Sequence, residues 1–195
     1  LQSLSLYILA SIDRDNLKSS ESGIKYFILS ALSSGLLLYG CSLLYGFTGS
    51  TNFDLIANEL NKENTGAVFA MVFILVGLAF KVSAVPFHMW TPDVYQGAPT
   101  PITAFMSAGP KAAAFAAFMR VTYISLDSLQ VDMSAMFWFL AVVTMTVGNF
   151  IAISQKDVKR MLAFSSISHA GYALVGMVAW NEIGFSGILF YMLVY

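Results

Sequence analysis

The segment that decides the fold is residues 80–101, FKVSAVPFHMWTPDVYQGAPTP. It holds four of the chain's five prolines and begins at the end of an apolar run that contains Lys81. Proline has no amide hydrogen, and its ring clashes with the carbonyl four residues back, so Pro86 and Pro92 interrupt a helix and leave backbone groups free near Val82. The sequence therefore predicts a broken helix over residues 66–96, with the break just after Lys81.

Composition places this broken helix in a lipid bilayer. The 195 residues are 57% hydrophobic and 11% charged, with a mean hydropathy of +0.72, whereas soluble domains carry roughly 25% charged residues. A net charge of -1 gives no basic surface for nucleic acid. The single cysteine, Cys41, cannot form an intramolecular disulfide, and no Cys or His cluster has metal-ligand spacing. We expect an integral membrane protein in contact with lipid, with no metal and no nucleic acid partner.

Apolar runs give the number of spans. About 20 apolar residues cross the hydrocarbon core as a helix, and nothing alternates with the period of two that a barrel requires. The prediction is an all-α, polytopic transmembrane helix bundle with one discontinuous helix, a single domain over residues 1–195. Both ends lie inside apolar runs, so we expect a fragment of about seven spans. Full spans are expected at 24–46, 66–92, 102–124, 134–154 and 160–180, partial spans at 1–12 and 184–195, and polar loops at 13–22, 48–65, 97–101, 127–132, 155–159 and 181–183.

The loops differ in charge in a way that orients this bundle. Lys62 and Arg120 are the basic residues expected on one side of the membrane. By the positive-inside rule, the more basic side faces the cytoplasm or its organellar equivalent. The six basic residues expected on that side are Arg14, Lys18, Lys25, Lys156, Lys159 and Arg160.

Two lysines, Lys81 and Lys111, lie inside apolar segments. A lysine near the bilayer centre costs on the order of 3 kcal/mol, so it usually faces a protein interior or a watered cavity. Burial disfavours a charged amine and a nearby carboxylate favours it, so a change of partners can load or release a proton. Both lysines are therefore candidate proton-translocation residues that exchange protons through water. The alternatives are a static buried ion pair for Lys81 and, beside Pro110, a packing kink with Lys111 reaching a loop.

His88 and His169 are the only histidines, and either side chain could relay protons near neutral pH. His88 follows the break and could instead bond the carbonyls that the break frees. His169 is expected on a polar helix face with Ser165, Ser166 and Tyr172. Serine also joins membrane helices by hydrogen bonds, so this face could be structural.

The rest of the chain shows no redox or hydrolytic apparatus. There is no glycine loop for phosphate and no cysteine set for iron and sulfur. The energy for any translocation should therefore come from outside this chain.

Asp93 is expected to cap or end the short helix that follows the break.

Three parts of the sequence resemble a known family. Residues 80–101, Lys111 and residues 158–167, VKRMLAFSSI, are similar to the antiporter-like subunits of respiratory complex I and of the Mrp antiporters. The run WTPDVYQGAPTP, residues 90–101, most resembles the subunit N type of bacterial NADH:quinone oxidoreductase. The similarity extends over essentially the whole chain, although residues 158–167 are shared more widely across the superfamily.

The resemblance implies a subunit of about fourteen helices with two inverted five-helix repeats, of which this chain would be roughly helices five to eleven. Lys81 matches the lysine at the first broken helix, and Lys111 matches the lysine that passes protons toward the centre. The glutamate that the family pairs with the first lysine would fall just before Leu1. The resemblance also implies that other membrane-arm subunits are partners, that they or further subunits bind NADH, FMN, iron–sulfur clusters and quinone, and that the location is the cell inner membrane.

The expected function is proton translocation within NADH:quinone oxidoreductase, driven by quinone reduction in neighbouring subunits. One alternative is a subunit of an Mrp-type cation/proton antiporter or of a membrane-bound hydrogenase from the same superfamily. Another is a structural spacer, in which the buried lysines would tolerate replacement by methionine or glutamine.

Overall fold

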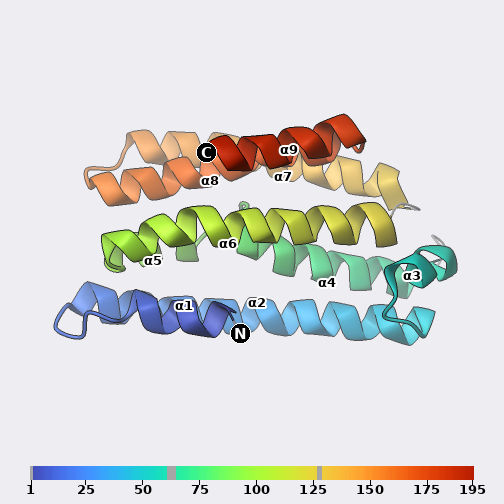
Figure 1. Cartoon of the computed structure of the whole chain (residues 1–195), viewed down its shortest axis with the longest axis horizontal. Coiled ribbons are helices and arrows are strands. Elements are labelled where there is room, and N and C mark those ends of the chain that lie inside the picture. The colour runs from blue at the N-terminus through green and yellow to red at the C-terminus, as the bar shows by residue number, and fades with distance from the viewer. Residues whose placement is uncertain (1, 61–64, 127–128) are drawn as a thin grey trace.

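The computed structural model describes residues 2–60, 65–126 and 129–195. Within these residues the chain forms nine α-helices and one π-helical turn, which lie along a common long axis (Figure 1). The elements are α1 Gln2–Ala10, α2 Leu17–Thr48, α3 Phe53–Glu59, α4 Thr65–Val82, α5 Trp90–Gly97, α6 Thr100–Arg120, η1 Val121–Ser125, α7 Gln130–Ile153, α8 Val158–Val178 and α9 Glu182–Val194.

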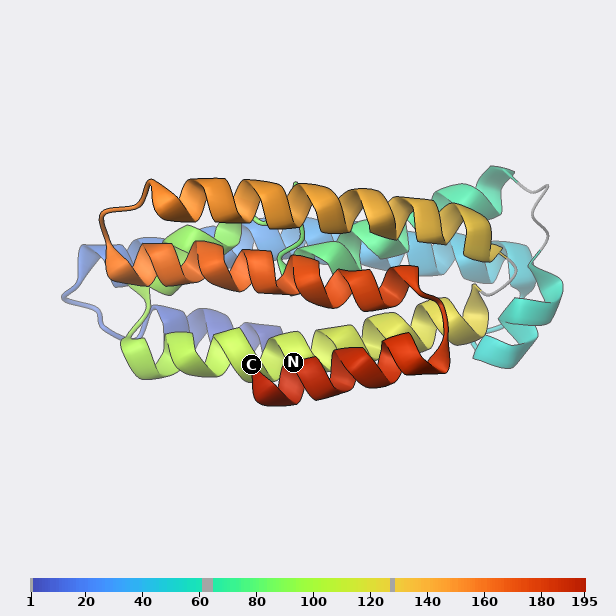
Figure 2. The same cartoon turned by 90° about the horizontal axis from the view of Figure 1, so that it is seen from above.

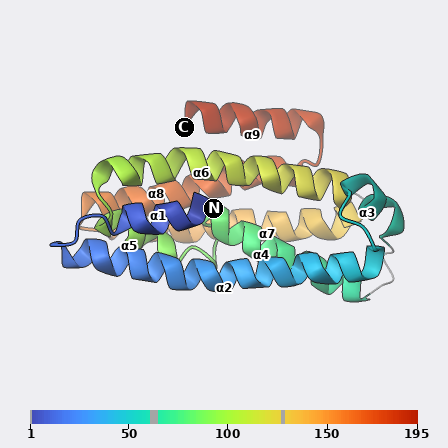
Figure 3. The same cartoon turned by 60° about the horizontal axis from the view of Figure 1, so that its bottom comes forward.

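The helices form three groups across the bundle. In Figure 1, α1 and α2 lie on one side, α4, α5 and α6 in the middle, and α7, α8 and α9 on the other side, and in Figure 2 the α7, α8 and α9 group is nearest the viewer. Figure 3 shows α1 between α2 and α6, with α9 beyond α6. The α1–α2, α5–α6 and α7–α8 connections meet at one end, and α3 and the α8–α9 connection lie at the other (Figure 1). This arrangement places the described parts of the predicted loops at the expected ends of the bundle, whereas residues 61–64, which include Lys62, and residues 127–128 lie outside the described residues.

Four of the described helices are long and apolar enough to cross a membrane: α2, α6 continued by η1, α7 and α8. α4 and α9 are shorter apolar helices. Large apolar side chains such as Leu38, Phe139 and Phe150 are exposed on the outside of the bundle, where a bilayer would cover them. The chain is therefore a multi-pass, all-helical membrane protein, as the sequence predicts.

α2 starts earlier than the apolar pattern predicts. Its first residue is Leu17, whereas residues 13–22 are expected to form a loop. The side chain of Asn16 accepts a hydrogen bond from the Lys18 amide at 3.1 Å, which satisfies one of the free N–H groups of the first turn. The expectation was wrong because hydropathy marks the part of a helix within lipid, whereas the capping residue sets where the helix begins.

The expected loop at residues 48–65 contains a short helix, α3. Asn52 begins it by accepting hydrogen bonds from the amides of Asp54 and Leu55, at 2.9 and 3.4 Å. The guanidinium of Arg120, at the end of α6, lies 5.9 Å from the centre of the Phe53 ring. α3 therefore packs against this end of the bundle, which span length alone could not predict.

The predicted broken helix is present, with its break between α4 and α5. Ser83 has a φ of 65°, in the left-handed region that residues other than glycine rarely adopt. The Thr91 hydroxyl donates to Ser83 Oγ at 2.7 Å, and the Val85 amide donates to Thr144 Oγ1 of α7 at 3.0 Å. Side chains of α5 and α7 therefore satisfy polar groups at the break that Pro86 predicts.

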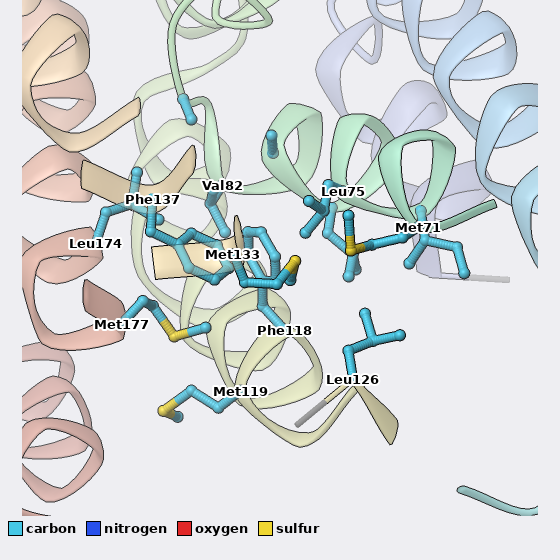
Figure 4. Close-up of a cluster of buried hydrophobic side chains, with 14 of the residues drawn as sticks. Met71, Leu75, Val82, Phe118, Met119, Leu126, Met133, Phe137, Leu174 and Met177 are labelled. Atoms are coloured by element: carbon cyan, nitrogen blue, oxygen red, sulfur yellow. The ribbon is translucent and has the colours of Figure 1, made fainter. Parts of the chain in front are cut away.

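An apolar core between α4, α6, α7 and α8 supports the break (Figure 4). Met71, Phe118, Met133 and Phe137 are fully buried in it. The rings of Phe118 and Phe137 meet edge to face at 5.2 Å, a favourable aromatic geometry. This core fixes α6 and α8, the two helices that hold the second candidate lysine.

Candidate functional site

Lys81 lies in the last turn of α4, half-buried beside the break. Its Nζ donates to Ser3 Oγ at 3.1 Å and to Ser30 Oγ at 3.0 Å, from α1 and α2. Ser30 also accepts a hydrogen bond from the Tyr7 hydroxyl at 2.6 Å. The ion pairs among the described residues do not include Lys81. The static ion-pair alternative therefore has no partner in this part of the chain, and hydroxyl groups hold the ammonium instead.

A cavity of about 220 Å³ adjoins Lys81, as the break predicts. Its volume is large enough for several water molecules. Side chains of α1, α2, α4, α5 and α6 line it: Gln2, Ser3, Leu6, Tyr26, Leu78, Lys81, Trp90, Met106, Pro110, Ala113, Ala114 and Ala117. The amine thus faces a space inside the protein that has both polar and apolar walls.

Lys111 lies in the middle of α6 and is 3% exposed. Its Nζ donates to Ser166 Oγ at 2.7 Å and to the Ser166 carbonyl at 3.0 Å, both on α8. The centre of the Tyr95 ring lies 5.8 Å from the same nitrogen. The alternative in which Lys111 reaches a loop is wrong, because the ammonium is enclosed between α5, α6 and α8.

The two amines have different surroundings. Pro110 and Ala114 of α6 line the cavity beside Lys81, whereas Lys111 bonds to Ser166, which lines a second cavity of about 480 Å³. Lys111 itself is not among the lining residues of either cavity. Their roles in proton translocation stay predictions.

The second cavity has a wall rich in hydroxyl groups. His169 lines it together with Ser165 and Ser166, as the predicted polar face of this helix requires. The Nδ1 atom of His169 lies 2.5 Å from the Tyr191 hydroxyl of α9. Tyr172 is not among the lining residues. The full lining is Tyr95, Thr100, Thr103, Ala104, Ser107, Ala108, Lys159, Leu162, Ala163, Ser165, Ser166, His169 and Tyr195.

His88 lies within the break, half-buried between α4 and α5. Its Nδ1 atom is buried and has no hydrogen-bond partner among the described residues. The ring lies 6.5 Å from that of Phe164 on α8. The bond from His88 to a freed carbonyl and its relay role therefore both stay predictions.

Asp93 does not cap α5, contrary to expectation. It lies in the first turn, where its Oδ2 accepts from Lys25 Nζ at 2.7 Å and its Oδ1 from Arg160 Nη1 at 2.5 Å. Glu21 lies 2.7 Å from Lys25 on α2. The carboxylate tethers α5 to α2 and α8, because two cations on neighbouring helices attract it more strongly than one helix end. The expected topology already placed Lys25 and Arg160 near the same membrane surface.

No described group of three or more His, Cys, Asp or Glu side chains could hold a metal ion. The cavities beside the lysines are lined by hydroxyl and apolar groups rather than by the ligands that iron–sulfur clusters need. That this chain carries no cofactor stays a prediction.

A family match accounts for this geometry. Residues 1–195 match the family described as "NADH:quinone oxidoreductase/Mrp antiporter, TM". The chain belongs to this family. It is 59% identical over 205 residues to the NADH-quinone oxidoreductase subunit N of Bartonella bacilliformis, covering 100% of this chain and 42% of that protein. The chain spans about 41% of the length of other curated relatives that it matches.

Chains in solved membrane complexes share the fold. Respiratory complex I from Thermus thermophilus contains a chain that matches with a TM-score of 0.78 and 41% identity, over 98% of this chain and 41% of that one. The Mrp complex from Dietzia sp. DQ12-45-1b contains a chain that matches with a TM-score of 0.83 and 27% identity, over 91% of this chain and 33% of that one. The chain is thus more similar in sequence to the complex I chain than to the Mrp chain.

Sequence reasoning missed several residues of the site. Ser3 and Ser30 contact Lys81, and Tyr95 lies beside Lys111, but none of them was expected in the site. Lone serines in apolar helices were a weak signal, since serine is common between membrane helices. Which of them face a buried lysine depends on helix packing, which the sequence does not give.

Proposed function

We propose that this chain is part of a proton-translocating membrane subunit of a bacterial NADH:quinone oxidoreductase, of the subunit N type. The observation that carries the proposal is a half-buried lysine and a fully buried lysine beside a broken helix, each held by hydroxyl groups, with one cavity lined by Lys81 and a second one lined by Ser166. The names of the bacterial relatives support the assignment and are compatible with a location in the bacterial inner membrane.

The geometry around Lys81 suits reversible proton binding. Ser3 and Ser30 can accept hydrogen bonds from an ammonium and can also donate to a neutral amine, since a hydroxyl does both. Neither serine fixes the charge of the amine as a carboxylate would. A charge that approaches or leaves on a neighbouring element can therefore shift the proton affinity of Lys81.

Lys111 is the second proton carrier in this proposal. Its ammonium bonds to Ser166, whose hydroxyl lines the second cavity together with His169. A proton released from Lys111 would enter this cavity. His169 and the tyrosine hydroxyls around it offer groups that can pass it on.

The chemistry that drives translocation would take place in other subunits. In this proposal, NADH, FMN, iron–sulfur clusters and quinone bind elsewhere in the complex, and the membrane-arm neighbours of this chain transmit the change of charge. The chain itself would act as a non-redox part of the enzyme.

Proton pumping in membrane vesicles tests the proposal. Lys81→Ala and Lys111→Ala are introduced into the gene, so that each variant assembles in its own membrane complex. NADH-driven acidification is then measured together with NADH oxidation. We expect Lys81→Ala to reduce pumping strongly and Lys111→Ala to reduce it comparably or less, while the exposed Lys156→Ala pumps normally. Normal pumping by both buried-lysine variants would contradict the proposal.

An Mrp-type cation/proton antiporter is the second candidate, because the Mrp chain has the same fold. The two candidates differ in energy source. Co-purification of the chain with flavin and iron–sulfur subunits supports the oxidoreductase. Sodium-driven proton exchange without these subunits would support the antiporter.

A further inference from the structure

Pro110 leaves one carbonyl of α6 without its helical partner. In a regular helix, the amide of residue 110 would donate to the carbonyl of Met106. Pro110 lies inside α6 and has no amide hydrogen, so this bond cannot form. Met106 is 2% exposed, so water has little access to replace the bond. A buried carbonyl in this position needs another donor.

Tyr95 of α5 supplies that donor. Its hydroxyl donates to the Met106 carbonyl at 3.1 Å, and its side chain is 2% exposed. The Tyr95 carbonyl in turn accepts from Thr103 Oγ1 on α6 at 2.9 Å. Two hydrogen bonds therefore attach the second half of the broken helix to the N-terminal part of α6, on the membrane-surface side of Pro110.

Lys111 directly follows Pro110, so the backbone around the missing hydrogen bond carries the lysine side chain. The Tyr95 ring also lies 5.8 Å from Lys111 Nζ, a distance at which an aromatic face attracts a cation. Ser166 accepts two hydrogen bonds from the same ammonium. Tyr95 thus contacts both the backbone beside Pro110, at Met106, and the ammonium itself.

We propose that Tyr95 is a positioning residue for Lys111: its hydroxyl replaces the backbone donor that Pro110 lacks, and so aims the ammonium at Ser166. This inference rests on the proposed role of Lys111 in proton translocation. It assigns to α5 a function toward Lys111, in addition to its contribution of Trp90 to the cavity beside Lys81.

Tyr95→Phe keeps the ring and removes only the hydroxyl. We expect the number of protons pumped per NADH oxidised to fall by roughly five-fold. An unpaired buried hydrogen-bond acceptor disfavours the arrangement that positions Lys111 by at least about that factor. Tyr123→Phe is the matched control, since Tyr123 is exposed and its ring meets the Phe185 ring of α9 edge to face. Pumping is normalised to the amount of assembled complex, so that reduced folding does not count.

Pro110→Ala separates positioning from a general packing effect. The alanine amide can donate to the Met106 carbonyl, so the Tyr95 hydroxyl is no longer needed for that carbonyl. We expect Tyr95→Phe to lower pumping little further in the Pro110→Ala background, whereas independent packing defects would add. If Tyr95→Phe alone does not assemble, restored assembly in the double variant supports the proposal, and failure of both overturns it.

Two results would overturn the positioning role. One is normal pumping by Tyr95→Phe, and the other is a full additive loss in the double variant. Lys111→Ala, measured in parallel, distinguishes the two proposals. Normal pumping by Lys111→Ala would remove the proposed function of that lysine, whereas a loss in Lys111→Ala with normal pumping in Tyr95→Phe would remove only the inference about Tyr95.

Discussion

Lys111 Nζ lies 2.7 Å from Ser166 Oγ and 3.0 Å from the Ser166 carbonyl, so one residue of α8 holds the ammonium of α6 through two hydrogen bonds. No ion pair among the described residues includes Lys111. A buried cation held only by uncharged groups is sensitive to each of them, since hydrogen bonds to charged groups are about twice as strong as neutral ones.

Ser166→Ala should lower proton pumping. The change removes the shorter of the two bonds to Lys111 and weakens the hold on its ammonium by about 1.5 to 3 kcal/mol, the range for bonds to charged groups. Pumping per NADH oxidised is measured in vesicles. Ser168→Ala is the control, because Ser168 is buried on the same helix but bonds to the Phe164 carbonyl of its own helix. Equal pumping by the two variants would count against a role for Ser166.

Asp93→Asn should loosen the attachment of α5. The Asp93 carboxylate forms ion pairs with Lys25 and Arg160. The side chains of these three residues are each about one-third exposed or slightly more. Since solvent screens such pairs, we expect a loss of about 1 to 2 kcal/mol in stability rather than the larger value of a fully buried pair. Thermal unfolding of the complex in detergent measures this change. Glu21→Gln, which removes only the pair within α2, should have a smaller effect.

Asp157 should make the start of α8 sensitive to acid. The carboxylate accepts a hydrogen bond from the Arg160 amide at 2.9 Å, and this bond lowers the pKa of Asp157 below its ordinary value. The stabilisation is therefore fully present above the pKa of the unfolded chain and is lost as the pH falls through the lower pKa of the folded state.

The Asp157 prediction is checked by measuring the unfolding temperature between roughly pH 6 and pH 3, a range that includes the titration of an ordinary aspartate. Asp157→Asn keeps a capping oxygen without a titrating charge, so it should reduce the decrease in unfolding temperature at low pH. The same decrease in both proteins would show that other groups cause it.

Gly148→Ala should destabilise the contact between α7 and α8. A Cβ at this position would lie 2.9 Å from the Ser168 amide nitrogen, which is backbone and cannot move aside cheaply. We expect a loss of about 1 to 3 kcal/mol from overpacking. Gly46→Ala is the matched control, because a Cβ there meets nothing within 4 Å and alanine favours a helix. Unfolding temperatures of the two variants should therefore change in opposite directions.

Most of the fold could be predicted because membrane helices follow simple length and composition rules. Pro86 located the break and the apolar runs located the spans, since both depend on local chemistry. The start of α2 and the presence of α3 were missed because Asn16 and Asn52 set them, and capping acts outside the apolar pattern.

The site was predictable in part. Lys81 and Lys111 were identified because a charge inside an apolar run is unusual. Their partners were not, because Ser30 and Ser166 differ from other membrane serines only in the direction in which packing turns them. Asp93 was assigned a local role, whereas the folded chain brings Lys25 and Arg160 to it from residues far away in the sequence.

The most direct test of the account is the number of protons pumped per NADH oxidised when Lys81 is replaced by methionine, which keeps a long apolar chain and removes the amine. The variant is assembled in its own complex, and acidification of vesicles is recorded together with NADH oxidation. We predict a large decrease in protons per NADH, because the tunable amine beside the cavity is gone. An unchanged ratio with a normally assembled complex would contradict the account and favour a structural spacer.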